Sequence, residues 1–126
     1  MDDHAHGKEF IEEISKEYSE ILKSSKQSVY IYFDDELKVC NKNFSDLLDY
    51  ESPEEWARVK TSFPEAFVAE ESQEDLVSAY QNAMEKMTGT QKTITWKKKN
   101  GGKVKTKVIL VPIAFKDHLF ALHFIS

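Results

Sequence analysis

Apolar residues recur at helical spacing near the start of the chain and at alternating spacing near its end. Across residues 8–25 they fall three or four positions apart, which predicts an amphipathic helix. Its apolar face holds Phe10, Ile11, Ile14, Tyr18, Ile21 and Leu22. Residues 1–7 are polar, and we expect a disordered lead there. His4 and His6 form an isolated pair in this polar segment, so solvated side chains are a simpler interpretation than a metal site.

Two short strands are predicted next. Residues 28–34 are rich in β-branched and aromatic side chains, and a second apolar run at 37–40 follows an acidic turn. Asn41 then predicts a helix start, because an asparagine side chain can accept a free backbone N–H of the first turn. The helix that follows carries Phe44, Leu47 and Leu48 on one face. This segment should therefore lie with its apolar side against a sheet.

Two further helices are predicted from their first residues. Ser52 followed by Glu55 forms a capping box, which starts a short helix. Ser72 followed by Asp75 predicts the start of a long helix, and Gly89 predicts its end. The apolar residues of the long helix are Leu76, Val77, Tyr80, Ala83, Met84 and Met87.

The period changes to two after residue 90, which predicts three strands at about 91–99, 103–113 and 118–125. A three-residue loop at 100–102 would place Trp96 beside Thr106, whereas a two-residue loop would set apolar residues opposite lysines. The first arrangement creates a lysine face of Lys97, Lys99, Lys103, Lys105 and Lys107. We interpret this face as solvated, with docking of an acidic partner, including another copy, as the alternative.

The sheet needs cover on both faces. Ile109, Val111 and Ile113 continue the lysine side of their strand, and the last strand is apolar on both sides. The central helices can cover one face. The helix at 8–25 can cover the other, either within its own chain or from a partner chain in a homodimer.

Composition limits the class of protein. The chain has 126 residues, 40% hydrophobic and 12% aromatic, which suits one domain with one core. It has no apolar run of 18 residues and an acidic start, so we expect neither a membrane span nor a secretory signal. The net charge of −5 argues against a general nucleic-acid binder. Cys40 is the single cysteine, which fits a reducing compartment, and we expect the cytoplasm.

The joint order of these motifs resembles the PAS (Per-Arnt-Sim) family of sensory modules. The resemblance rests on the segment from Asn41 to Tyr50, the long helix ending at Gly89, and Trp96 ahead of a Lys-Asn-Gly-Gly turn. It covers residues 28–126 and implies an α+β fold. That fold is a five-stranded antiparallel sheet with short helices and one long helix on one face, plus the N-terminal amphipathic cap helix.

Two positions depart from the family pattern. Asp49 stands where the family usually has glycine, and a left-handed residue there costs about 1 kcal/mol unless the aspartate side chain, which tolerates this conformation, is satisfied locally. Phe124-Ile125-Ser126 stands where the family often has Asp-Ile-Thr before an output helix. We expect either a separate output kinase or regulator domain or a stand-alone module.

The resemblance also implies a pocket between the long helix and the sheet. The candidate lining residues are Tyr32, Phe44, Leu48, Phe67, Leu76, Tyr80, Met84, Trp96, Val108, Leu110 and Phe120, although core packing is the simpler interpretation of each one taken singly. Residues 51–88 contain neither cysteine nor histidine, which argues against a covalent flavin adduct and against haem. A non-covalent flavin, a fatty acid or a small metabolite stays open.

The chemistry-bearing residues give no catalytic pattern. No nucleophile with an adjacent base, no metal constellation and no phosphate loop is present in the sequence. We expect a buried, unreactive Cys40, an exposed His118 and a paired or outward His123. The sequence therefore predicts a non-catalytic sensory and interaction module that dimerises through its first helix.

Two other readings of the sequence stay open. The first is a small enzyme or binder resembling the ketosteroid isomerase and nuclear transport factor cone, which would need Asp34 or His123 inside its cavity. The second is a dimerisation scaffold with a filled core and no ligand.

Overall fold

The computed structural model describes residues 3–126 and contains a five-stranded antiparallel sheet in the order β2-β1-β5-β4-β3. The strands are β1 (Ser28–Tyr32), β2 (Lys38–Cys40), β3 (Thr90–Lys97), β4 (Lys103–Phe115) and β5 (His118–Ile125). The sheet brings the first and last strands together, since β1 pairs with β5 from Ser28↔Ile125 to Tyr32↔Ala121. The predicted sheet architecture is confirmed.

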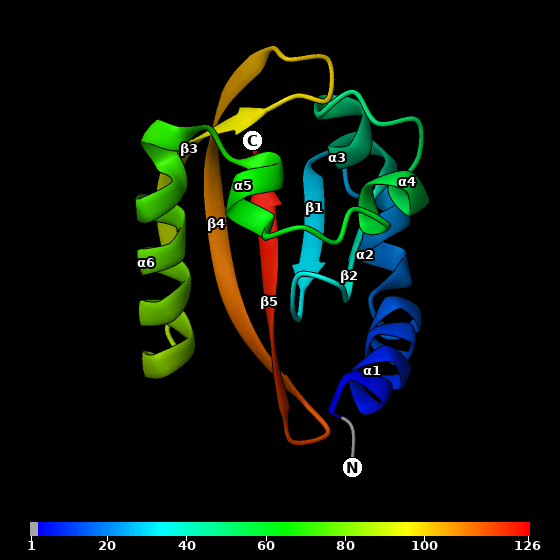
Figure 1. The fold of residues 1–126 in the computed structure, drawn as a ribbon. Helices are drawn as coiled ribbons and strands as arrows, with labels where there is room; N and C mark the ends of the chain where they lie inside the picture. The colour runs from blue at the N-terminus through cyan, green and yellow to red at the C-terminus, as the bar shows by residue number, and fades with distance from the viewer. Residues whose placement is uncertain (1–2) are drawn as a thin grey trace.

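Four helices cover the inner face of this sheet, and the longest lies along β3 and β4 (Figure 1). They are α3 (Lys42–Leu47), α4 (Pro53–Ala57), α5 (Phe63–Phe67) and α6 (Glu70–Lys86). The main core between these helices and the sheet is dominated by the buried aromatic residues Tyr30, Phe44, Trp56, Phe63, Phe67 and Trp96. The main core therefore contains large rings from β1, β3, α3, α4 and α5.

Asn41 fixes the junction between the sheet and the helices. Its Oδ1 accepts the backbone N–H of Phe44 at 3.0 Å, which caps α3 as predicted, and also the N–H of Val29 at 3.0 Å. Its Nδ2 donates to the carbonyl of Gln27 at 2.9 Å. One buried side chain thus ties the start of β1 to the start of α3. The turn after α3 places Asp49 at φ 65°, the left-handed conformation expected there.

The ends of α6 differ from the sequence prediction. The helix begins at Glu70 after Ala69, so Ser72 is inside it and does not cap it. The Ser72 hydroxyl instead accepts the backbone N–H of Thr95 on β3 at 3.0 Å. At the other end Met87, not Gly89, takes the left-handed conformation, with φ 52°. The tertiary contact with β3 has replaced the local cap.

The β3–β4 register is two residues away from the predicted one. Trp96 pairs with Val104, and Lys97 pairs with Lys103, so the connection is longer than the predicted loop at 100–102. Lys98 N–H bonds to Gly102 O at 2.8 Å, and Gly101 turns the chain with φ 98°. A shift by two keeps every side chain on its predicted face. The predicted residue pairs between β3 and β4 were therefore wrong, whereas the predicted face of the sheet for each side chain was right.

The outer face of the sheet is covered by the chain's own first helices, α1 (Asp3–Glu17) and α2 (Ser19–Ser24). Ile11 and Ile14 of α1 are buried in a second cluster with Val29, Ile31, Leu37, Phe120 and Leu122. Phe10, Tyr18, Ile21 and Leu22 pack against the same cluster. The single helix expected at 8–25 is thus two helices that meet at Tyr18, and they cap the sheet within one chain.

The first helix also begins earlier than expected. α1 starts at Asp3, inside the segment 1–7 for which the sequence predicts a disordered lead. Met1 and Asp2 lie outside the described residues, as do the side chains of His4 and His6, so the interpretation of that histidine pair stays a prediction.

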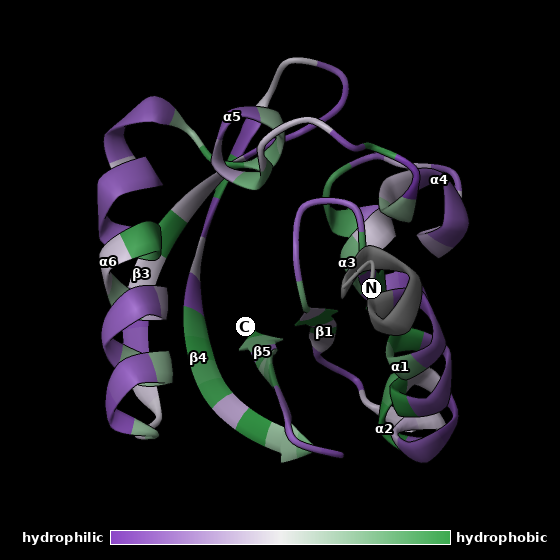
Figure 2. Cartoon of the chain, turned by 60° about the horizontal axis from the view of Figure 1, so that its bottom comes forward, coloured by the Kyte–Doolittle hydropathy of each residue, from purple (hydrophilic) through white to green (hydrophobic). Residues whose placement is uncertain are grey.

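The outer face changes from polar to apolar along β4. Figure 2 shows the start of β4 in purple and its second half in green. Lys103, Lys105 and Lys107 are exposed at the start, whereas Val111 and Ile113 pack against the outer cluster. Lys99 does not join the lysine face, because it lies in the turn and pairs with Glu55 at 3.1 Å. Ile109, between the two regions, is 43% exposed.

Candidate ligand-binding site

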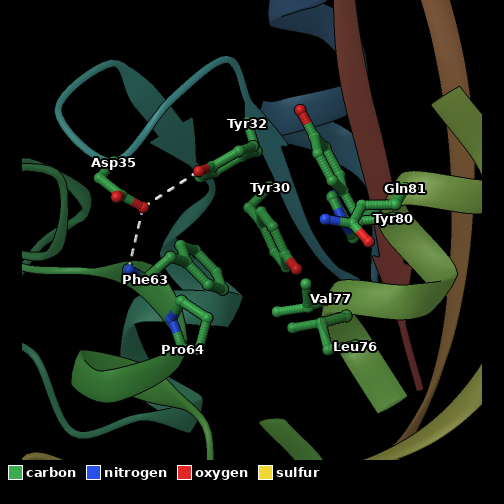
Figure 3. A pocket seen from close by; sticks show the side chains of 10 residues that line it. Tyr30, Tyr32, Asp35, Phe63, Pro64, Leu76, Val77, Tyr80 and Gln81 are labelled. Atoms are coloured by element: carbon green, nitrogen blue, oxygen red, sulfur yellow. Dashed lines mark hydrogen bonds between the residues drawn. The ribbon is translucent and has the colours of Figure 1, made fainter. Parts of the chain in front are cut away.

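A cavity of about 230 Å³ lies between the sheet and the helices α5 and α6. β1, β5, the β1–β2 turn and both helices contribute to its walls, as Figure 3 shows from close by. The lining residues are Tyr30, Tyr32, Asp35, Phe63, Pro64, Leu76, Val77, Tyr80, Gln81 and His123. A mostly apolar lining with a few polar groups is typical of a small-molecule site.

Asp35 holds the wall of the cavity on the side of the β1–β2 turn. One of its carboxylate oxygens accepts the Tyr32 hydroxyl at 3.0 Å and the backbone N–H of Phe63 at 2.9 Å (Figure 3). Burial, followed by the nearby Asp35 charge, raises the pKa of the Tyr32 phenol, which therefore keeps its proton at neutral pH. The turn, β1 and α5 are thus joined through one carboxylate.

Tyr30 supplies a polar group without a protein partner. The side chain is 1% exposed, and within the described part of the chain its hydroxyl makes no hydrogen bond. The hydroxyl is directed toward Leu76 and Val77 of α6 (Figure 3). Burial raises the pKa of this phenol well above its ordinary value, so it is a neutral donor and acceptor. A buried hydroxyl without a partner carries a cost that a ligand could remove.

His123 supports the Tyr30 ring. The two rings stack with centroids 3.9 Å apart, and His123 Nδ1 lies 3.1 Å from the carbonyl oxygen of Ala121. That contact assigns the ring proton to Nδ1. Burial lowers the pKa of His123 to about 3, so the imidazole is neutral at physiological pH. The sequence predicts a paired or outward His123; the ring is paired with the Ala121 carbonyl and lies on the inner face, so the first of the two alternatives holds.

Several solved structures are similar to this chain over most of its length. A PAS domain from a Colwellia psychrerythraea protein matches with a TM-score of 0.70 and 17% identity, over 90% of this chain and 95% of that one. A PAS domain of an HTR-like protein from Haloarcula marismortui matches at 0.67 and 16%, over 94% of each chain. A domain of a sensor histidine kinase/response regulator from Geobacter sulfurreducens matches at 0.64 and 12%, over 90% and 93%.

The fold is that of a PAS domain. The assignment rests on structure, since no family model and no curated protein matches the sequence. The resemblance seen in the sequence is confirmed at the level of the fold. The alternative cone resembling ketosteroid isomerase loses its structural basis. Of its two eligible residues, Asp34 is occupied in a turn, where Oδ1 accepts the N–H groups of Glu36 and Leu37, and His123 lines the cavity as a neutral ring.

The structure brings three of the predicted pocket residues to the cavity of this PAS fold: Tyr32, Leu76 and Tyr80. Phe44, Leu48, Phe67, Trp96 and Val108 are packed in the main core instead. Leu110 and Met84 belong to a smaller cluster under α6. Phe120 lies on the opposite face of the sheet, in the outer cluster, so it cannot line the cavity. Phe120 was assigned to the wrong face because β5 is apolar on both sides, so the sequence pattern does not indicate which side faces the helices.

The sequence missed the other seven lining residues of the cavity: Tyr30, Asp35, Phe63, Pro64, Val77, Gln81 and His123. A signal existed for Tyr30, because it has the same parity in β1 as Tyr32. Asp35 was assigned to a turn only, since nothing local predicts that the turn reaches α5. Long-range pairing of β1 with β5 is what brings His123 beneath Tyr30.

Two buried groups near β2 lie outside the cavity. Cys40 is buried, and burial raises the pKa of its thiol, in agreement with an unreactive cysteine. Lys38 is 3% exposed, and its ammonium donates to the carbonyls of Asp35 at 2.7 Å and Val59 at 2.5 Å. Burial lowers the pKa of Lys38 to about 8. These contacts hold the β1–β2 turn against the segment after α4.

Between residues 3 and 126, no group of three or more histidine, cysteine or acidic side chains is arranged to hold a metal ion. In the same range, no helix has the length and apolar character that crossing a bilayer requires.

Proposed function

We propose that this chain is a sensory module of a signal-transduction system, with a small ligand bound in the cavity between the sheet, α5 and α6. The carrying observation is the Tyr30 hydroxyl, a buried polar group without a protein partner beside a cavity of about 230 Å³. The PAS fold supports the sensory role.

The size of the cavity supports a small metabolite as the ligand. Sites for drug-sized molecules measure roughly 300–1,000 Å³. A cavity of about 230 Å³ is smaller, which argues against an enclosed flavin or a long fatty acid. The module acts by binding: His123 is neutral and stacked, and Asp35 is engaged with Tyr32 and the backbone of Phe63, so neither is placed as a free base.

The partners we propose are a second copy of the chain and an output domain. The outer face keeps a strip of apolar side chains beside the N-terminal helices, formed by Ile109, Val111, Ile113 and Phe124. This strip supports a homodimer in which the helices frame the contact. The similar domain from a sensor histidine kinase supports a kinase or regulator as the output, and the single buried cysteine supports a cytoplasmic location.

Native mass spectrometry of freshly purified protein, compared with the denatured mass, tests both parts of the proposal. We expect a dimer that carries a bound small molecule. Ile109→Lys should convert it to a monomer, while Met87→Lys, at a residue 50% exposed on a different element, should leave it a dimer. A monomer of bare polypeptide mass that no small molecule shifts would contradict both.

A further inference from the structure

The shape of the cavity wall limits the kind of ligand. Four of its lining residues carry aromatic side chains close to one another: Tyr32 lies edge-on to Phe63 and to Tyr80, with centroids 5.3 and 5.4 Å away, and Tyr30 lies 5.3 Å from Phe63. Leu76 and Val77 supply the aliphatic side. An apolar cavity of 150 Å³ holds benzene. A cavity of about 230 Å³ with these walls fits a flat molecule of one or two rings.

One buried polar atom of this wall has no partner. Tyr30 Oη and Trp56 Nε1 are the fully buried side-chain polar atoms without a hydrogen bond in residues 3–126, and of the two residues Tyr30 lines the cavity. The Tyr32 hydroxyl is already bonded to Asp35. A ligand that offers Tyr30 a hydrogen-bonding group would satisfy it, whereas a purely apolar ligand would leave it unpaired.

The charges around the cavity are unfavourable for anions. Asp35 is the ionisable carboxyl group in the lining, and Asp34 adjoins it in the turn. The remaining titratable lining groups are the three tyrosines and His123, which burial keeps neutral at pH 7. Neither lysine nor arginine occurs among the described residues that line the cavity. An anionic ligand would therefore enter without a counter-charge.

We infer that the cavity selects a small, neutral aromatic compound with one hydrogen-bonding group, which bonds to Tyr30 Oη. The inference rests on the proposed function and adds to it the chemical class of the ligand and the residue that recognises it. Binding converts the unpaired hydroxyl into a bonded one and fills the space between β1 and α6. Tyr30 then selects ligands that carry a hydrogen-bonding group, and the negative charge of Asp35 disfavours anionic ligands.

Three ring compounds of similar size test this inference in the full chain: benzamide, toluene and benzoate. Titrations followed by two-dimensional amide NMR should give the tightest binding for benzamide. Toluene should bind about tenfold more weakly, which corresponds to the net value of one hydrogen bond. Benzoate should also bind at least about tenfold more weakly than benzamide.

Tyr30→Phe removes the hydroxyl and keeps the ring. It should erase the preference for benzamide over toluene, and its melting temperature should not fall, since an unpaired buried group is removed. Tyr50→Phe is the matched control, because Tyr50 packs against Phe67 and Lys99 and does not line the cavity. Equal binding of all three probes to the wild-type protein would overturn the inference even if the variant failed to fold.

The failure of this inference and that of the proposed function are distinguishable. A charged molecule that co-purifies with the chain, or a ligand whose affinity is the same in Tyr30→Phe, would overturn the ligand class and leave a ligand-binding module. No shift with any probe, together with a bare native mass, would overturn both.

Discussion

Individual side chains in this protein carry contacts that join segments far apart in the sequence. Asn41 is the clearest case, since its amide bonds to Val29, Phe44 and Gln27 at once. Local spacing predicts its capping role, because a cap involves neighbouring residues only. The bond to β1 needs the folded sheet, and no local pattern could have predicted it.

Asn41→Ala should lower the free energy of unfolding by about 2–3 kcal/mol, because it removes a helix cap and leaves buried backbone N–H groups without acceptors. Urea denaturation measures this change. Asn43→Ala is the matched control: Asn43 is exposed, and its bonds to the 25–27 carbonyls are 3.2 to 3.5 Å long. Equal losses in the two variants would contradict the role given to Asn41.

His123 should make stability depend on pH in the acid range. Its pKa is about 3 in the folded protein and close to 6.5 when unfolded, so the unfolded chain binds the proton first. The stability contributed by the neutral ring is complete above pH 6.5 and is lost as pH falls toward 3, by at most about 1.4 kcal/mol per pH unit. His123→Phe keeps a stacked ring and should flatten this dependence in denaturant titrations at several pH values.

His118→Phe serves as the control for that titration, because His118 contacts Phe10 and Phe33 on the outer side and is half-buried. It should keep the acid dependence of the wild-type protein. If both histidine variants behaved like the wild type, the loss of stability at low pH would come from other groups.

Among the elements, those with local signals match their predictions and those set by long-range contacts do not. The first strands and α3 lie where their patterns predict. α6 begins before its predicted cap because Ser72 bonds to Thr95 in β3 instead. In the β3–β4 hairpin the side chains lie on their predicted faces of the sheet, but the residue pairs differ from the predicted pairs. Two loops whose lengths differ by two residues give the same alternation of faces, so the pattern cannot distinguish them.

The end of α6 offers a test at the same scale. Met87 adopts φ 52° and is 50% exposed, so a glycine there would avoid backbone strain and lose little packing. Met87→Gly should raise the free energy of unfolding by up to about 1 kcal/mol. Met84→Gly, inside the helix, should lower it by a similar amount or more. Destabilisation by Met87→Gly would mean that the methionine side chain has a stabilising contact.

At the scale of the whole molecule, the sheet separates an inner and an outer apolar cluster that differ in how completely they are packed. The outer cluster is filled by α1 and the strands beneath it, while the inner layer contains both a packed aromatic core and the cavity. The sequence could predict two covered faces from the apolar last strand. It could not predict which residues leave space, because a cavity depends on how side chains from β1, β5, α5, α6 and the β1–β2 turn pack together.

The central claim is that the cavity beside Tyr30 binds a small ligand, and a cavity-filling variant tests it most directly. Amide NMR spectra of wild-type protein, Val77→Phe and Asn82→Phe would be recorded during titration with the same small aromatic probe. Val77 lines the cavity, whereas Asn82 is exposed on the same helix. We predict probe-dependent shifts around the cavity in the wild-type protein and in Asn82→Phe, and their loss in Val77→Phe. Unchanged shifts in Val77→Phe, or none in the wild-type protein, would contradict the claim.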